Sequence, residues 1–173
     1  MNGDGSSQRR LLTILAADIA GYSAAMSQAE DAAIAQLGDL RRIMDEIILS
    51  RSGKIANTAG DSVVAVFESV LNGVRAAIEI QEAHDRHYRS ATNQLEMRFR
   101  IGLNLGDVII QPNGDVLGNG VNIAARLESL AKPGGICLSK KTMDHVSDNL
   151  DYQFSKIGVH VLKNIQAPVT VYA

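Results

Sequence analysis

The sequence predicts an α+β domain in which helices cover one face of an antiparallel sheet. The apolar patterns run in the order strand, helix, strand, strand, helix, strand, followed by further mixed elements. A hairpin turn is expected at residues 59–62, between two short apolar runs. Apolar side chains alternate over residues 97–105, as they do in a strand with one buried face. This order is that of a ferredoxin-like core with an extension.

The first half of the chain supplies four of these elements. Residues 11–17 form a nearly unbroken apolar run, which predicts a buried central strand. Residues 31–50 have helical spacing, and Gly53 is expected to end that helix. Its predicted apolar stripe consists of Ile34, Leu37, Ile43 and Ile47. Two short strands are expected at residues 54–58 and 63–67.

The second half begins with an amphipathic helix at residues 69–87 and a polar loop at 89–96. After the alternating strand, a short helix at 120–130 should bury Ile123, Leu127 and Leu130. The remaining predicted elements are a strand at 136–138, a helix at 140–146, and short strands around 152, 159–162 and 169–172.

The composition is that of one globular domain. The chain has 173 residues, of which 46% are hydrophobic and 21% charged, enough for a sizeable core. Residues 1–8 are polar and glycine-rich, so we expect a flexible leader before a domain at 9–173. A net charge of -2 argues against a general surface for nucleic acid or an anionic membrane.

Several features indicate a cytoplasmic protein. Cys137 is the only cysteine and lies in an apolar run, so we expect a buried thiol and no disulfide within the chain. The amino-terminal residues include no apolar signal region, and no later segment is long and apolar enough for a membrane span. The chain stops in or just after an apparent strand, so it could be one piece of a longer protein with further modules.

Two aspartates are placed where their carboxylates should meet. Asp18 follows the buried first strand, and Asp61 lies in the hairpin turn, which the expected topology puts beside the end of that strand. Like charges so close repel unless a cation lies between them, and oxygen ligands suit Mg²⁺ or Mn²⁺. Alone, Asp18 could cap the next helix and Asp61 could serve the turn. Together they predict a metal site.

Two further features suit phosphate chemistry. Ala20, Gly21 and Tyr22 follow Asp18 directly, and backbone amides at a tight turn into a helix form an anion site. Asn122 and Arg126 are four residues apart and share one face of the predicted short helix. An amide beside a guanidinium suits charge on a phosphoryl group, but the same pair is also typical of a solvated helix face.

These segments together resemble the catalytic domain of class III adenylyl and guanylyl cyclases. The resemblance runs from about Arg10 to Tyr172, in four ordered blocks at matching separations. The blocks are residues 15–22, 58–62, 99–106 and 115–127, and residues 162–165 fit as well. The chain is most similar to the bacterial branch, whose cyclase domains are often joined to other modules.

The resemblance implies how metal and phosphate would be bound. Asp18 and Asp61 match the two metal-binding aspartates, and the Ile19 carbonyl could add a ligand. Arg126 matches the residue that stabilises charge on the transferring α-phosphate. Lys163 resembles the lysine that contacts the terminal phosphates, with an ordinary surface lysine as the alternative.

The resemblance also implies how base and ribose would be read. Asp115 matches the residue that accepts a hydrogen bond from the adenine amino group, and Asn122 the one that orients the ribose. Asn57 departs from the pattern, because adenylyl cyclases usually carry a lysine there that reads adenine. Its amide can still donate to adenine N1, whereas guanine O6 needs a donor that ionised Asp115 does not offer. ATP is the expected substrate, with relaxed ATP/GTP selectivity as an alternative.

The implied reaction is attack of the ribose 3′-oxygen on the α-phosphorus with loss of pyrophosphate, assisted by two Mg²⁺ or Mn²⁺ ions. In this family the metal aspartates come from one subunit and Asp115, Asn122 and Arg126 from the other, which implies a homodimer. One alternative is a degenerate cyclase-like module that binds nucleotide or only dimerises. Another is a diguanylate cyclase, whose Gly-Gly-Asp-Glu-Phe hairpin is missing. A transition-metal site at His84 and His87 lacks an apparent third ligand.

Overall fold

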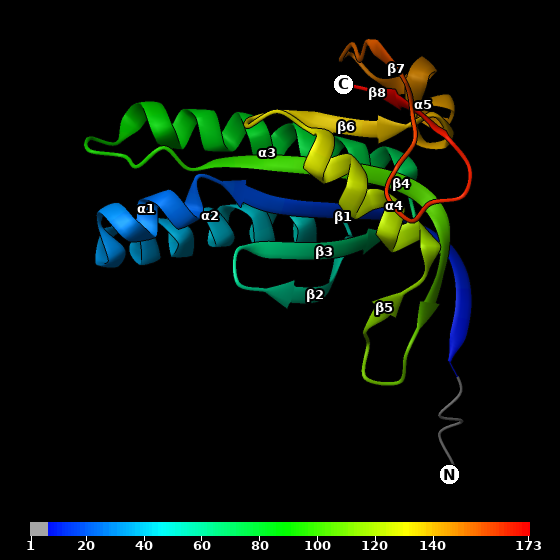
Figure 1. Cartoon of the computed structure of the whole chain (residues 1–173), viewed down its shortest axis with the longest axis horizontal. Coiled ribbons are helices and arrows are strands. Elements are labelled where there is room, and N and C mark those ends of the chain that lie inside the picture. Colours follow the sequence, from blue (N-terminus) through cyan, green and yellow to red (C-terminus); the bar gives the residue numbers. More distant parts are fainter. Residues whose placement is uncertain (1–6) are drawn as a thin grey trace.

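Residues 7–173, which the computed structural model describes, form one eight-stranded sheet with helices on both faces (Figure 1). The strands are β1 (Gln8–Ala20), β2 (Lys54–Ala59), β3 (Ser62–Phe67), β4 (Arg98–Ile110), β5 (Val116–Leu117), β6 (Ile136–Ser139), β7 (Lys156–His160) and β8 (Val169–Tyr172). The helices are α1 (Tyr22–Gln28), α2 (Glu30–Ser50), α3 (Val70–Ser90), α4 (Asn119–Leu130) and α5 (Lys140–Val146), with a 3₁₀ turn at Ser147–Asn149.

Two long strands form the centre of the sheet. The strand order is β2-β3-β1-β4-β6-β8-β7, and β5 pairs with β4 outside this path. Strands β1 and β4 are antiparallel over their whole length, from Gln8 opposite Ile110 to Ala20 opposite Arg98. The β4–β6 pair is parallel, while the other pairs are antiparallel. The predicted α+β class with a mainly antiparallel sheet is therefore confirmed.

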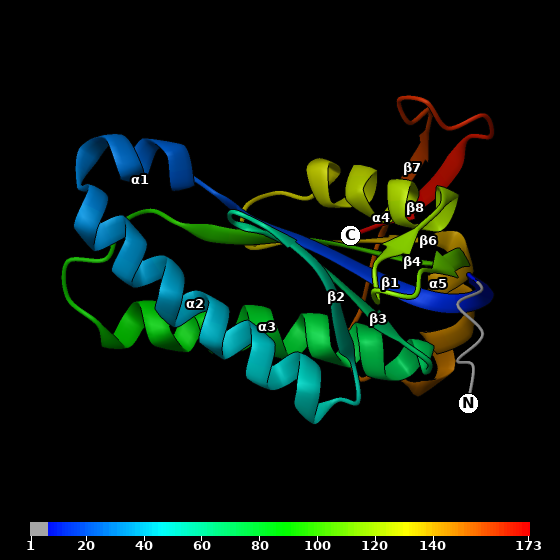
Figure 2. The same ribbon diagram turned by 90° about the horizontal axis from the view of Figure 1, so that it is seen from below.

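The helices divide between the two faces of the sheet (Figure 2). Leu15 and Ala17 of β1 belong to the larger core cluster, which α2 and α3 cover as predicted. The alternate residues Ile14 and Ala16 pack with Ala124 of α4 on the other face. Helix α4 is thus the exception to the prediction that helices cover a single face.

Helix α4 lies directly on the backbone of β4. A Cβ atom on Gly102 would collide with backbone atoms of Ala124 and Glu128. A Cβ atom on Gly106 would come within 3.0 Å of the Gly120 Cα atom, and one on Gly120 within 2.8 Å of a β4 carbonyl oxygen. The helix and the strand therefore touch without intervening side chains, which fixes α4 relative to the sheet.

Some boundaries and burial predictions were wrong. Residues 1–6 of the expected leader lie outside the described part, and β1 already begins at Gln8. Ile34 is 51% exposed, because Ala33, Leu40 and Met44 form the buried stripe of α2 instead. Leu130 is 38% exposed near the end of α4. The strand expected around residue 152 is absent, and β7 begins only at Lys156.

The prediction that Cys137 is buried is confirmed. The Cys137 thiol is free and buried under α4, and burial raises its pKa. Ser69 and Ser139 cap α3 and α5, each accepting a hydrogen bond from a backbone amide in the first turn. None of the described helices combines the length and apolar character needed to cross a bilayer.

Candidate active site

The centre of the candidate site is an ion pair between adjacent strands. Asp18 of β1 lies opposite Arg100 of β4, on the face covered by α4. The Arg100 Nε atom donates to Asp18 Oδ1 at 2.9 Å, and its Nη2 atom donates to Oδ2. The Asp18 side chain is only 16% exposed and the Arg100 side chain 29%. This bidentate ion pair fixes the Asp18 carboxylate near the end of the central strand β1.

A second carboxylate reaches the same guanidinium from α4. Glu128 Oε1 lies 3.6 Å from Arg100 Nη2, is buried, and has no hydrogen-bond partner among the described residues. Burial, followed by the nearby charge of Asp18, raises the pKa of Glu128 to about 7. A substantial fraction of Glu128 is therefore protonated at neutral pH.

Asp61 brings a third negative charge to this cluster. It lies in the β2–β3 turn, where Gly60 adopts a φ of 60° and Ala59 pairs with Ser62. Val63 pairs with Ala17 of β1, so the turn lies beside Asp18 as the sequence predicted. The hydrogen bond to Asp18 is the main cause that raises the pKa of Arg100, and the charge of Asp61 adds a smaller contribution there and at Glu128. The carboxylates of Asp18, Glu128 and Asp61 thus all interact electrostatically with the single guanidinium of Arg100.

This donor set fits a hard divalent cation. Asp18 and Asp61 offer only oxygen ligands, which is the preference of Mg²⁺ and Mn²⁺. The cluster contains more carboxylates than cations, and the buried Glu128 Oε1 atom has no hydrogen-bond donor among the described residues. An added cation would therefore stabilise it. Within residues 7–173 no three His, Cys, Asp or Glu side chains are arranged to hold a metal ion by themselves. Two aspartates would therefore need further oxygens from backbone, water or phosphate.

A separate polar network lies at the β4–β5 hairpin. Asn57 of β2 donates from Nδ2 to Asp115 Oδ1 at 3.3 Å and accepts at Oδ1 from the Val116 amide at 3.2 Å. Asn113 donates to Asp115 Oδ2 at 2.7 Å and accepts from the Asp115 amide at 3.0 Å. The structure thus joins two residues that were predicted to read the base, Asn57 and Asp115.

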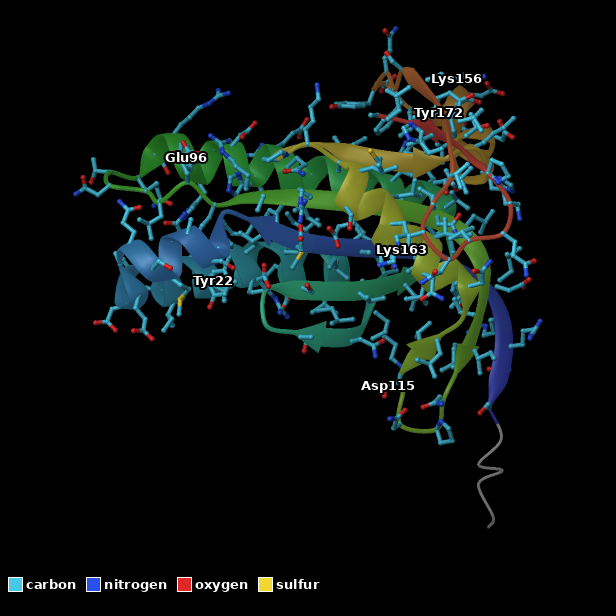
Figure 3. All side chains as sticks on the ribbon, viewed as in Figure 1. Tyr22, Glu96, Asp115, Lys156, Lys163 and Tyr172 are labelled. Carbon is cyan, nitrogen blue, oxygen red and sulfur yellow. The ribbon has the colours of Figure 1, made fainter. Side chains whose placement is uncertain are left out.

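The predicted anion loop lies at the end of β1. Ala20 ends the strand and Tyr22 begins α1, with exposed Gly21 between them at a φ of 89°. A Cβ atom on Gly21 would also collide with the Glu96 carbonyl oxygen, so only glycine fits this turn. Figure 3 shows Tyr22 and Glu96, which flank this turn, on α1 and on the segment before β4.

Three predicted residues stand apart from both clusters. Asn122 and Arg126 lie on α4, and Lys163 lies on the exposed loop between β7 and β8 (Figure 3). Their side chains make no hydrogen bond or ion pair with any part of the chain that the structure describes. The segment after Lys163, from Asn164, borders a cavity of about 710 Å³ beside the start of α4. These groups remain available to an external partner.

Sequence reasoning missed Arg100, Glu128 and Asn113. Arg100 occupies a polar position of the alternating strand β4, on the face that α4 covers, and a half-buried arginine there needs an acid beside it. Glu128 follows Ala124 by four residues and so lies on the sheet-facing side of α4. Asn113 gave no signal beyond that of a turn residue.

An acidic cluster at the end of a central strand can hold divalent metal ions, and such ions commonly bind the phosphates of nucleotides. Residues 6–173 match the model of the adenylate and guanylate cyclase catalytic domain. The chain therefore belongs to this family. A curated relative, "Putative adenylate cyclase 3" of Rhizobium meliloti, is 34% identical over 96% of this chain. The chain spans only 28% of that relative.

Solved structures agree with this assignment. The adenylate/guanylate cyclase/hydrolase from Silicibacter pomeroyi is 36% identical, with a TM-score of 0.89 over 96% of this chain and 97% of that one. The adenylyl cyclase CyaB from P. aeruginosa, at 23% identity, shares the fold with a TM-score of 0.87, covering 96% and 94% of the two chains. The guanylyl cyclase Cya2, at 22% identity, shares it with a TM-score of 0.82, covering 96% and 92%.

Proposed function

We propose that this domain converts ATP into 3′,5′-cyclic AMP and pyrophosphate, as a homodimer with two divalent ions in each site. The observation that carries the proposal is the placement of Asp18 beside the Asp61 turn, within a cluster that has more carboxylates than cations. Such an excess is costly for a resting domain and suits the binding of Mg²⁺ or Mn²⁺.

Asn122, Arg126 and Lys163, which lie away from the acidic cluster, suit an active site formed by two protomers. Asn122 and Arg126 on α4 and Lys163 on the β7–β8 loop would meet a nucleotide held at the aspartates of the partner protomer. Arg126 would stabilise charge on the α-phosphate, Asn122 would orient the ribose, and Lys163 would contact the terminal phosphates. One chain would hold half of each site, and a two-fold pair would hold two sites.

The chemistry follows from these positions. The ribose 3′-hydroxyl gives its proton to water or to the substrate, its oxygen attacks the α-phosphorus in line, the bond to the bridging oxygen breaks, and pyrophosphate leaves. Divalent ions bound at Asp18 and Asp61 would lower the pKa of the 3′-hydroxyl and neutralise the phosphates. Ala20, Gly21 and Tyr22 would present backbone amides to the phosphates, while the Ile19 carbonyl would face the metal site.

A direct assay tests the activity. Purified protein is incubated with Mn²⁺ and either ATP or GTP, and the cyclic nucleotide and pyrophosphate are quantified by chromatography. We expect cyclic AMP to form faster than cyclic GMP, and the Asp18→Asn/Asp61→Asn variant to be inactive. A faster rate on GTP would replace adenylate by guanylate cyclase activity. A folded dimer that binds ATP without turnover would favour the degenerate regulatory module.

Complementation tests the shared site. One variant lacks Asp18 and Asp61, and the other lacks Asn122 and Arg126. Mixing them should restore activity, because a heterodimer contains one intact site. Differently tagged chains show by pull-down that heterodimers form. If they form without activity, all groups of a site come from one chain.

We infer that the domain works in the cytoplasm, where ATP is available and a free thiol stays reduced. We also propose that it is joined to other modules in a longer protein, since the chain spans only 28% of one curated relative and 35% of others.

A further inference from the structure

Both polar atoms of the Asn57 side-chain amide form hydrogen bonds within the chain. Its oxygen accepts from the Val116 backbone amide at 3.2 Å, and its nitrogen donates to Asp115 Oδ1 at 3.3 Å. Rotating the amide by half a turn would set two donors against each other and two acceptors against each other. The Val116 amide therefore fixes which end of Asn57 faces Asp115.

A bulge in β2 aims Asn57 at this network. Ile55 pairs with Ala65 and Asn57 pairs with Val64, so Ala56 has no partner of its own. One extra residue reverses the face to which the following side chain points. It puts Asn57 on the face of Val64, which packs in the cluster beneath α4. In a regular strand Asn57 would point to the opposite face.

Asn113 completes the arrangement from the hairpin turn. Its amide donates to Asp115 Oδ2 at 2.7 Å, while its oxygen accepts from the Asp115 backbone amide at 3.0 Å. Gly114, at a φ of 90°, lets the chain turn tightly enough for these contacts. Each carboxylate oxygen of Asp115 thus receives one amide donor and retains lone pairs for an external donor.

We propose that Asn57 and Asn113 are positioning residues that hold Asp115 as a pure acceptor, and that the base is read through Asp115 alone. This inference rests on the proposed cyclase function and concerns the nucleobase specificity of that site. A pure acceptor suits the exocyclic amino group of adenine and opposes the carbonyl oxygen of guanine. The direct contact to adenine N1 expected for Asn57 is thereby replaced by an indirect role.

A double-mutant cycle separates the two roles. The chains are wild type, Asn57→Ala, Asp115→Ala and the double variant, assayed as dimers with Mn²⁺ and ATP or GTP. We expect kcat/KM for ATP to fall about 10-fold in Asn57→Ala, mainly through KM, and more in Asp115→Ala. The double variant should match Asp115→Ala, and the preference for ATP over GTP should shrink in all three. Additive losses, or a kcat effect without a KM effect, would overturn the proposal.

A second pair of variants controls for folding. Asn113→Ala should raise KM for ATP and weaken ATP preference, whereas Asn149→Ala, on the exposed 3₁₀ turn, should do neither. Melting temperatures identify any variant that loses its fold, and calorimetric titration with a non-cyclisable ATP analogue gives affinity without turnover. Wild-type protein that neither binds nor cyclises ATP would overturn the cyclase function as well. An active enzyme whose Asn113→Ala variant behaves like Asn149→Ala would overturn only the role of Asn113.

Discussion

The guanidinium of Arg100 donates two hydrogen bonds to the carboxylate of Asp18. Asp18, a candidate metal ligand, is therefore already paired with a cationic side chain of the protein. A divalent ion at Asp18 must compete with this guanidinium or share the carboxylate with it. Glu128, 3.6 Å from Arg100, is a second acceptor within reach.

Removing Arg100 should therefore strengthen divalent-ion binding. Arg100→Ala leaves Asp18 and Glu128 without their counter-charge, and we expect a loss of about 1 to 3 kcal/mol in the free energy of unfolding. Mn²⁺ should recover part of this loss and raise the melting temperature more than in wild type. Differential scanning fluorimetry with and without Mn²⁺ measures both effects. Asp18→Asn is the matched control and should abolish the Mn²⁺ shift; a wild-type shift in that variant contradicts the assigned site.

Glu128→Gln should change how stability depends on pH. The pKa of Glu128 is about 7 in the folded domain against 4.5 for an unperturbed carboxyl, so the folded state holds its proton more tightly. Its contribution to stability is complete below pH 4.5 and is lost as the pH rises through 7. The glutamine variant lacks this loss and should be more stable than wild type above pH 7. Urea titrations at several pH values in EDTA measure it, and parallel curves for the two proteins would refute it.

His84 should make the domain less stable as the pH falls, which is the opposite of the effect of Glu128. Burial lowers its pKa below 6.5, and its Nε2 atom lies 2.9 Å from the Met97 carbonyl oxygen. The unfolded chain takes up the proton first, so stability is complete above pH 6.5 and falls as the pH drops below it. His84→Gln can still donate to Met97 and should lose less stability between about pH 7.5 and 5.5. Urea titrations across this pH range measure the difference, and His145→Gln at an exposed position controls for the exchange of a histidine for glutamine.

A methyl group on Gly102 should separate α4 from the sheet. The added carbon of Gly102→Ala would collide with backbone atoms of Ala124 and Glu128, and backbone does not yield as side chains do. We expect a loss of about 2 to 4 kcal/mol in the free energy of unfolding. Gly38→Ala, in α2 with open space around it, should gain up to about 1 kcal/mol. Chemical denaturation compares the two variants, and equal effects would contradict the close packing.

The meeting of Asp18 with the Asp61 turn could be predicted, because hairpin topology alone sets a turn beside the end of a neighbouring strand. The Asp18–Arg100 pair could not, since it depends on register: Asp18 lies opposite Arg100 only when Gln8 pairs with Ile110. Apolar runs as continuous as that of β1 define such a register weakly.

The prediction of which helix residues are buried was wrong for a related reason. Large apolar residues such as Ile34 suggested the buried stripe of α2, but Ala33 one position earlier faces the core. A shift of one residue turns a helix face by about 100°. The Asn57 network was equally hidden, because a β-bulge leaves no reliable mark in sequence.

Glycines at 102, 106 and 120 bring α4 against β4 with no side-chain layer that could be compressed or slide. We therefore expect the helix that carries Arg126 and the strand that carries Arg100 to move as one rigid body. In the proposed dimer, a regulator would then change the site by shifting one protomer against the other, and not by moving α4 against the sheet within a protomer.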